Sequence, residues 1–364
     1  MKLLDFGPIA AFLGRGRASI TIPSMDGAFR PNDFLEKARV VAEHPGADCL
    51  AIANGRLLLS AGDSVYAVGA ENSDPVARFE DSVTALEASG DLIAVGLASG
   101  GVRIIGGKQE DRVFTEITGR AISCPTALSF QGNSLVVANG SSQTKAEDWS
   151  RDLLERNASG EVLSIDLESG AEAVLGSHLA YANGLTETAS GQIAVSQSWN
   201  HCISVLDQQK TIASVCQNLP GYPSRISRAP DGGYWLAIFG MRTQLIEFIL
   251  REDGYRNQML ETVPPEYWVA PSLTSREHFM DPLQQGGVKQ LGIKKPWAPP
   301  RSYGLAVKLD ADFNPKFSVH SRAGGQCHGV TSAVEIDGTL YVASRGAGQV
   351  RAVDLAVVEQ ETVR

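Results

Sequence analysis

The feature that most restricts the fold of this chain is a local pattern that occurs six times. Each copy begins at a turn rich in Gly, Asp or Asn, continues as a short alternating strand ending in small residues, and leads after a gap to a second strand. The paired segments are 55–60 with 64–68, 91–95 with 101–105, 133–138 with 160–166, 192–196 with 201–207, 233–237 with 244–248, and 338–344 with 349–354. Period-two alternation between such turns predicts antiparallel hairpins.

Six similar hairpins predict an all-β fold, a six-bladed β-propeller. Most copies are spaced roughly as far apart as four-stranded blades, about 40–50 residues. Radial repetition also protects the edges of the sheets. Two β-sandwich domains are the alternative, but they would not account for six copies of one pattern. Residues 38–42 precede the first copy, and we expect them to supply the outer strand of the last blade and so close the ring.

The predicted domain organisation is one propeller with an extension and two insertions. Residues 1–36 are expected to form an N-terminal extension packed on the propeller, which spans residues 37–364. Residues 143–156 read as a helix. Residues 252–302 are rich in Pro and contain two Trp residues, and they are a candidate lid, because long structured loops on a rigid scaffold often cover binding sites. A packing excursion without a role in ligand binding is the alternative for this segment.

Composition excludes several classes of partner. The chain has 364 residues, of which 43% are hydrophobic, and a net charge of −9 without a cluster of Lys and Arg. Nucleic acids and anionic membranes are therefore not expected as partners. Five scattered cysteines without a CxxC pair are typical of a reducing compartment. The apolar run at residues 9–13 is too short to span a bilayer, so we expect a cytoplasmic protein without a membrane span. The oligomeric state stays open.

The starts of the later blades carry a family resemblance. Ala-Asn-Gly-Leu at 182–185, Leu-Pro-Gly-Tyr-Pro-Ser-Arg-Ile at 219–226 and the segment 329–335 occur in order, and a hairpin follows each one. In these segments the chain resembles the strictosidine synthase-like branch of the six-bladed propellers, a group that also includes paraoxonases and gluconolactonase-type lactonases. The resemblance covers most of residues 15–356. It implies the propeller fold and places the functional chemistry at the mouth of the central channel.

The resemblance to calcium-dependent lactonases also implies a set of metal ligands, which this chain matches only in part. Asp48 stands at the acidic position of blade one and Asn183 at the Asn of blade four. Thr126 replaces the Asn expected in blade three, and Ser224-Arg225 replaces the pair expected in blade five. A hard cation prefers six or more oxygen ligands, and a guanidinium repels it. We therefore expect no cofactor, with Ca²⁺ held by Asp48 and Asn183 as the alternative.

The same positions form a candidate catalytic site, because a propeller brings the starts of its inner strands to one channel mouth. His328 can act as a general base for water, and Arg225 can stabilise an oxyanion or bind a substrate carboxylate. Asp48 can orient either group. The expected substrate-binding residues are Asn183, Ser224, Thr126 and Thr331. This set predicts a hydrolase of small lactones or esters, with a small molecule as its substrate.

Three other interpretations remain open. The propeller can bind a small metabolite without turning it over. It can catalyse an amine–aldehyde condensation of the strictosidine synthase type, although that family uses a glutamate where this chain has Thr331, and Glu335 lies four residues further along. Finally, Asp48 and Arg225 can form a structural ion pair that plugs the channel, with His328 only bonded to a backbone carbonyl.

Overall fold

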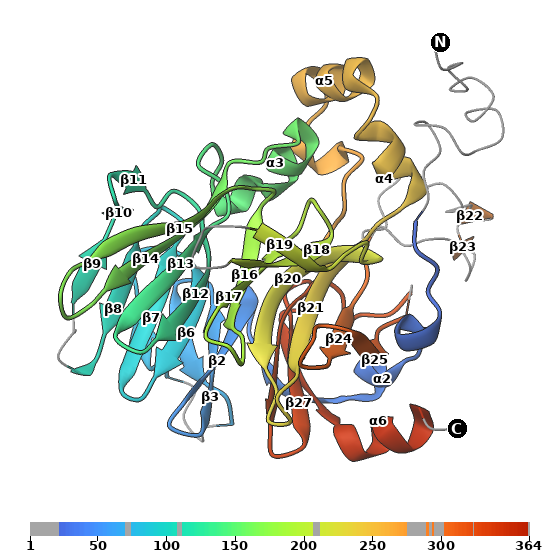
Figure 1. Ribbon diagram of the computed structural model, residues 1–364. Helices are drawn as coiled ribbons and strands as arrows, with labels where there is room; N and C mark the ends of the chain where they lie inside the picture. The colour runs from blue at the N-terminus through green and yellow to red at the C-terminus, as the bar shows by residue number, and fades with distance from the viewer. Residues whose placement is uncertain are drawn as a thin grey trace, which may run out of the picture.

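The structure is a computed structural model that describes residues 22–69, 74–107, 111–206, 212–274, 302–322 and 324–362, together with the short strands β22 (Lys289–Gln290) and β23 (Ile293–Lys294). Six four-stranded antiparallel sheets make up the propeller (Figure 1). Residues 1–21 and most of 275–301 lie outside the described residues, and parts of the predicted extension and lid fall there. The six-bladed architecture expected from the hairpin pattern is confirmed.

Within each blade the strands follow one another in chain order from the central channel outward. Blade one contains β2 (Ala47–Ala53), β3 (Arg56–Ala61), β4 (Ser64–Ala67) and β5 (Ala77–Arg78), and blade two contains β6 (Val83–Ser89), β7 (Leu92–Leu97), β8 (Val102–Ile105) and β9 (Arg112–Phe114). Blade three contains β12 (Pro125–Gln131), β13 (Ser134–Asn139), β14 (Gly160–Asp166) and β15 (Glu172–Leu179), and blade four contains β16 (Ala182–Glu187), β17 (Ile193–Gln197), β18 (Cys202–Leu206) and β19 (Ile212–Cys216). Blade five contains β20 (Gly221–Arg228), β21 (Tyr234–Met241), β24 (Leu305–Leu309) and β25 (Pro315–His320), and blade six contains β26 (Val330–Ile336), β27 (Thr339–Ser344) and β28 (Gln349–Asp354). A short additional pair, β10 (Glu116–Ile117) with β11 (Arg120–Ala121), precedes blade three.

The ring is closed by the strand nearest the N-terminus, as predicted. β1 (Arg39–Glu43) pairs antiparallel with β28, so that Arg39 lies opposite Ala352 and Glu43 opposite Gln349. The inner strands contact one another around the ring, and β26 of blade six contacts β2 of blade one. The inner edge of each blade therefore lies inside the ring, where another chain cannot easily pair with it, which is how propellers limit edge-to-edge pairing.

Between each pair of neighbouring blades the described residues form one hydrophobic cluster, six in all, and further clusters lie under the helices. Trp235 is fully buried between blades five and six, where its indole Nε1 donates to Glu335 at 2.7 Å. Gly184 marks the closest approach of blades four and five, since a Cβ atom there would collide with the carbonyl oxygen of Ser224. Tight packing between blades fixes the distances across the channel.

One of the predicted strands is wrong. Residues 244–248 were expected to pair with the second strand of blade five, but they belong to helix α4 (Gln244–Ile249). The Thr243 hydroxyl accepts from the Ile246 amide at 3.2 Å and caps the helix. Ile246 and Ile249 are both buried, and their three-residue spacing suits a helix rather than a strand. After the insertion, β24 pairs with β21 in its place.

Short helices cover one end of the channel, which we call the lid end (Figure 1). They are η3 (Ala146–Asp148), α3 (Trp149–Glu155), α4, α5 (Asp253–Thr262) and η4 (Pro265–Tyr267). Helix α3 lies within the segment 143–156 that was predicted to be helical. It shares an apolar cluster with α4, α5 and the residue that follows η4, through Leu154, Ile249, Met259 and Trp268. The lid helices are thus packed on one another as well as on the blades.

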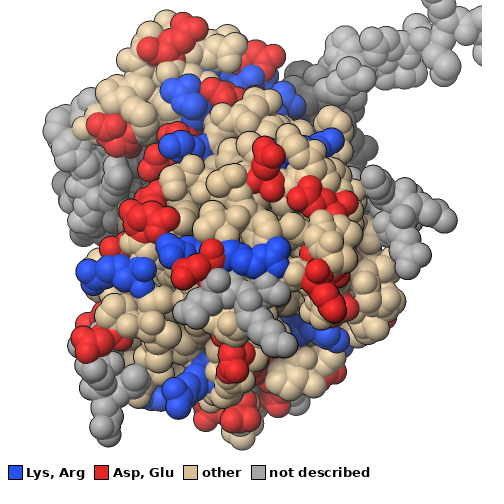
Figure 2. Space-filling view, turned by 90° about the vertical axis from the view of Figure 1, so that its left-hand side faces the viewer, with Lys and Arg blue, Asp and Glu red and all other residues tan. Residues whose placement is uncertain are grey.

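The two ends of the described chain lie beside blades five and six. η1 (Gly27–Phe29) contacts β25, and α2 (Phe34–Lys37) packs against β25 and β28. α6 (Leu355–Thr362) follows β28 directly. Among the described residues, no helix is both long and apolar enough to cross a membrane. On the face drawn in Figure 2, basic side chains are interspersed with acidic ones rather than gathered into a broad basic area.

Candidate functional site: a pocket at the channel mouth

All six inner strands are irregular at their first residues. The pairing register shifts between Ala47 and Leu50, Val83 and Ala85, Pro125 and Ala127, Ala182 and Gly184, Pro223 and Ile226, and Val330 and Ser332. Such β-bulges redirect side chains that a regular strand would point elsewhere. The residues inside these bulges line one pocket at the lid end; they are Asp48, Thr84, Thr126, Asn183, Ser224, Arg225 and Thr331.

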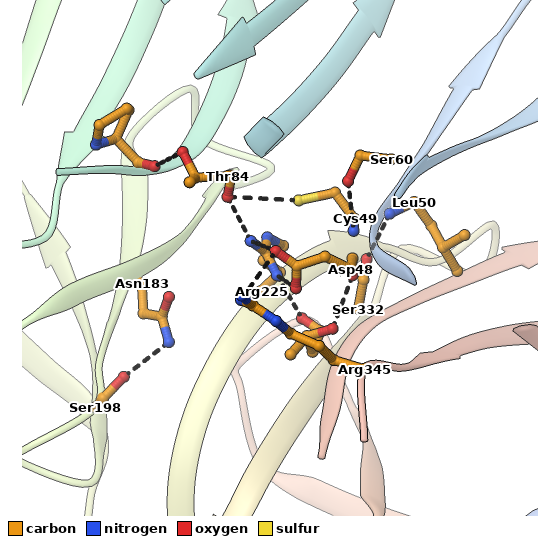
Figure 3. Close-up of polar contacts among 12 residues, drawn as sticks. Asp48, Cys49, Leu50, Ser60, Thr84, Asn183, Ser198, Arg225, Ser332 and Arg345 are labelled. Carbon is orange, nitrogen blue, oxygen red and sulfur yellow. Dashed lines mark hydrogen bonds and ion pairs between the residues drawn. The ribbon is translucent and has the colours of Figure 1, made fainter. Parts of the chain in front are cut away.

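An ion pair between Asp48 and Arg225 lies at the centre of this pocket (Figure 3). Arg225 Nη1 donates to Asp48 Oδ1 at 2.9 Å, and Nη2 donates to Oδ2 at 3.0 Å. Burial alone would raise the pKa of the Asp48 carboxyl, but the positive charges of Arg225 and Arg345 outweigh it and hold the pKa below its usual value. Asp48 is therefore ionised, both of its carboxylate oxygens accept from Arg225, and it is a poor candidate for a base.

The same guanidinium joins four blades. Nη2 of Arg225 also donates to the carbonyl of Thr84 at 2.6 Å, and Nη1 donates to that of Thr331 at 3.4 Å. All four of its terminal N–H groups thus point to oxygens of blades one, two and six. The expected bidentate contact of Arg225 with a substrate carboxylate is not open to it, because Asp48 holds that position. The alternative expectation, an ion pair that plugs the channel, describes the observed geometry.

The other bulge residues bond to the neighbouring blade. The Thr84 hydroxyl donates to the carbonyl of Pro125, that of Thr126 to Ala182, and that of Thr331 to Asp48, at 2.5–2.7 Å. Asn183 Nδ2 donates to Ser198 Oγ at 3.0 Å and to the Pro223 carbonyl at 3.4 Å. These donors are used within the protein. Of the Asn183 side chain, the Oδ1 acceptor is therefore the atom that can serve a ligand.

The wall beside the ion pair is aromatic, and sequence reasoning missed it. Trp149 of α3 and Phe239 of β21 meet edge to face with ring centroids 5.3 Å apart, and Tyr181 stacks on Trp199. Trp149, Phe239 and Tyr181 line the pocket together with Ala146, Leu273 and the bulge residues, and its space, open mouth included, is about 440 Å³. Burial raises the pKa of Tyr181 well above its usual value, so its hydroxyl is neutral. The pocket combines charged groups on one side with apolar rings on the other.

A second arginine, Arg345, was also missed. It lies in the loop between the second and third strands of blade six, and its Nη1 is 3.5 Å from Asp48 Oδ2. In a propeller this loop returns to the end of the channel where the inner strand begins. This position of the loop could have been inferred from the predicted fold, and it would have placed Arg345 near the channel mouth. Arg345 is 43% exposed in its side chain, whereas Arg225 is 14% exposed.

His328 is not among the residues that line the pocket. Its Nδ1 lies 2.7 Å from the Ser302 hydroxyl and its Nε2 lies 2.8 Å from the Arg322 carbonyl, and the residue is 1% exposed. The carbonyl accepts from Nε2, so in the neutral ring Nδ1 accepts from Ser302. Both ring nitrogens are therefore used in packing the segment before β26. The expected role of His328 as a general base has no support in this geometry. Glu335 is also turned away from the pocket, and its carboxylate accepts from Trp235 and lies 3.7 Å from Lys308.

The residues at the channel mouth do not fit the calcium ion that the resemblance implies. Both Asp48 oxygens face Arg225, and Arg345 adds a second positive charge beside them. Asn183 could contribute only one oxygen. In the described part of the chain no three His, Cys, Asp or Glu side chains are grouped as a metal site would require. A hard cation here would lack carboxylate ligands and meet two guanidiniums.

The far half of the channel holds a second cavity, of about 1070 Å³ including its opening. Its walls are mainly apolar side chains and hydroxyls of the inner strands, and its charged lining residues are Glu87, Glu187, Arg225 and Arg228. Glu187 and Arg228 lie 3.8 Å apart, and Arg225 is held by Asp48. Among the described residues no cation pairs with Glu87, and burial raises its pKa to about 7.

We expect Glu87→Gln to stabilise the protein above pH 7 and not below pH 4.5. An acid whose pKa is raised by folding destabilises the folded state once it ionises, so the penalty is absent below the unfolded pKa of 4.5 and complete above about 7. Because the cavity opens to water, we expect a gain of about 1–2 kcal/mol at pH 8. Urea unfolding at pH 4.5 and pH 8 measures it, with the exposed Glu168→Gln as control. An equal effect at both pH values would contradict this account.

Fold and site together define the class of this protein. It is a six-bladed β-propeller with short helices packed over one end, and a buried Asp–Arg pair lies at the channel mouth. The helical cover, the bulged inner strands and the aromatic wall form one continuous structural unit around the pocket.

The comparisons agree with this class. No family model matches the chain. It is 25% identical over 260 residues to an adipocyte plasma membrane-associated protein of Salmo salar, an alignment that covers 66% of this chain and 54% of the relative. It is 24% identical over 270 residues to the protein strictosidine synthase-like 6 of Arabidopsis thaliana, covering 73% of this chain and 64% of the relative. The chain thus spans between half and two thirds of these two relatives.

A third relative and a solved structure extend the comparison. The adipocyte plasma membrane-associated protein of Danio rerio is 24% identical over 376 aligned residues, with 92% of this chain and 82% of the relative covered. A solved structure described as a gluconolactonase superposes with a TM-score of 0.53 at 8% identity and covers 87% of this chain and 91% of its own. The expected resemblance to the strictosidine synthase-like branch is confirmed by these relatives, and the solved structure supports the fold.

Proposed function

We propose that this protein binds a small organic molecule in the pocket at its channel mouth, and that it does so without a metal ion. The observation that carries the proposal is the Asp48–Arg225 pair, because it fills the place where the resemblance would put a cation. Beside it the pocket keeps one exposed cationic group, one amide oxygen and an aromatic wall. Concave pockets that combine apolar or aromatic side chains with fixed polar groups are typical of small-molecule sites.

Metal-independent hydrolysis of small lactones or esters is the second candidate. It is favoured by the described gluconolactonase that shares the fold and by Arg345, which could stabilise an oxyanion. Activation of water also needs a base within hydrogen-bond reach. Among the described lining residues, Asp48 is the only carboxylate, and its low pKa and its ion pair make it unsuitable. Binding therefore comes first in our proposal, and hydrolysis second.

Amine–aldehyde condensation is the least supported candidate. Thr331 stands at the position nearest to the glutamate that the reaction would use, and its hydroxyl donates to the Asp48 carbonyl. Glu335 is bonded to Trp235 between the blades. Neither residue offers an acid or base to a ligand in the pocket.

We expect chelation to leave binding and any turnover unchanged. The test measures acid release from γ- and δ-lactones and aryl esters by pH-stat, and tryptophan fluorescence in parallel, with EDTA and then with added calcium. Turnover that survives EDTA would favour the hydrolase, whereas binding without turnover would favour the binding protein. Activity lost with EDTA and restored by calcium would contradict the metal-free site. Neither binding nor turnover across the panel would count against the pocket as a site for these compounds.

A further inference from the structure

Arg345 is held at the pocket by its backbone rather than by its side chain. Its amide donates to the carbonyl of Gly329 at 2.9 Å, and the next amide, of Gly346, donates to that of His328 at 3.1 Å. Gly346 has no room for a Cβ atom, because Leu273 of the lid segment lies against it. The loop is therefore fixed between the lid and blade six, and the Arg345 side chain extends from it into the pocket (Figure 3).

The pocket holds more positive than negative charge. Its ionised lining residues are one carboxylate, Asp48, and two guanidiniums, Arg225 and Arg345. Asp48 gives both oxygens to Arg225 in direct hydrogen bonds and meets Arg345 only at 3.5 Å. Asp152, an acid on the helix that carries Trp149, is 1% exposed and accepts from Trp199, Thr144 and Asn157. Among the described lining residues, one guanidinium is thus left without a matching carboxylate.

That charge belongs to Arg345. The terminal N–H groups of Arg225 already point to four protein oxygens. For Arg345 the described residues provide only the long contact with Asp48, so most of its five N–H groups remain available to a ligand. A planar guanidinium matches the two oxygens of a carboxylate better than it matches a single carbonyl oxygen.

We propose that Arg345 binds a carboxylate group of the ligand, so that the ligands of this pocket are small monocarboxylic acids with an apolar or aromatic body. The carboxylate would lie on Arg345, and the body would lie against Trp149, Phe239 and Tyr181. The Asn183 Oδ1 atom would accept from a hydroxyl or amide of a larger ligand. This inference rests on the proposed function, that the pocket is a small-molecule site.

Calorimetric titration with phenylacetate and its neutral counterpart phenylacetamide tests the proposal. On the unchanged protein we expect phenylacetate to bind at least tenfold more tightly than phenylacetamide. Arg345→Gln should remove this preference and leave the affinity for phenylacetamide within about twofold, while Arg345→Lys should retain part of it, since Lys keeps the charge but not the fork. Arg228→Gln, which removes the same charge at the far end of the channel, should leave both affinities unchanged.

The outcomes separate the two claims. If phenylacetate and phenylacetamide bind equally well, or if Arg345→Gln leaves the preference intact, the role of Arg345 is overturned while the small-molecule site stands. If neither compound binds the unchanged protein, both claims fail for this ligand class. Circular dichroism of each variant shows that the fold is kept, as we expect for a side chain that is 43% exposed and makes one long ion pair.

Discussion

Arg225→Ala is expected to lower the free energy of unfolding by about 3–5 kcal/mol, because it leaves the buried Asp48 carboxylate without its cation. Asp48 is 4% exposed, and Arg225 joins it to the carbonyls of Thr84 and Thr331 in two further blades. Urea unfolding followed by circular dichroism measures the change. Arg228→Ala, three residues further along the same strand and 56% exposed, is the matched control. We expect that control to change stability by less than about 1 kcal/mol.

The sign of the pH dependence provides a second check. Folding lowers the pKa of Asp48, so the pair contributes stability above the unfolded value of 3.8 and loses it as the pH falls through the folded pKa. The difference in the free energy of unfolding between Arg225→Ala and the unchanged protein should therefore become smaller as the pH is lowered. A double variant, Asp48→Leu with Arg225→Met, should recover part of the loss, since apolar residues remove the buried charge altogether. If Arg225→Ala proves as stable as Arg228→Ala, the ion pair between Asp48 and Arg225 does not stabilise the fold.

Asp152→Ala is expected to lower the free energy of unfolding by about 2–4 kcal/mol and to weaken ligand binding. Asp152 lies on α3, is 1% exposed, and accepts from Trp199 Nε1 at 2.7 Å, Thr144 Oγ1 at 2.7 Å and Asn157 Nδ2 at 3.1 Å. Removal of the carboxylate leaves three part-buried donors without this acceptor, at a cost that reaches about 1–3 kcal/mol for a donor that water cannot reach. Helix α3 carries Trp149 into the pocket, so its displacement should raise the dissociation constant of any bound ligand.

Two variants on the same helix control this result. Asp152→Asn keeps an acceptor for Trp199 and should lose less stability than Asp152→Ala. Glu155→Ala removes a side chain that is 35% exposed and bonds to Arg151 and Asn157, and it should change neither stability nor affinity appreciably. Thermal melts and a ligand titration on all three proteins make the comparison. If Asp152→Ala and Glu155→Ala have the same melting temperature and the same ligand affinity, the hydrogen bonds of Asp152 do not hold helix α3 at the pocket.

The inner-strand residues of the site could be predicted because a propeller repeats one arrangement. Asp48, Asn183 and Arg225 each stand at the start of an inner strand, and radial symmetry brings such positions to one channel mouth. Thr126, Ser224 and Thr331 converge there for the same reason. The roles of these side chains were harder to predict than their positions. Hydrogen bonding to the neighbouring blade uses the threonine hydroxyls and the Asn183 amide as donors, and this depends on distances between blades.

The residues of the aromatic wall and Arg345 could not be predicted in this way, because they do not lie at the start of an inner strand. Trp149 arrives from an inserted helix, and Phe239 comes from the end of a second strand. Arg345 comes from a loop more than a hundred residues away in sequence from Arg225. His328 stands two residues before β26, close to the position of the site residues, yet it turns toward Ser302 and Arg322. Orientation of a side chain at a strand start is set by the bulge and its neighbours, not by position alone.

By itself the sequence determined the number of blades, the closing strand and the ring of inner-strand positions, because period-two alternation and turn residues act over a few neighbouring residues. The tertiary structure decided how those positions are used. It folds residues 244–249 as a helix, introduces a bulge into each of the six inner strands, and pairs Asp48 with Arg225. These features depend on close packing and on charges brought together from distant segments, and such long-range contacts leave no local periodicity in the sequence.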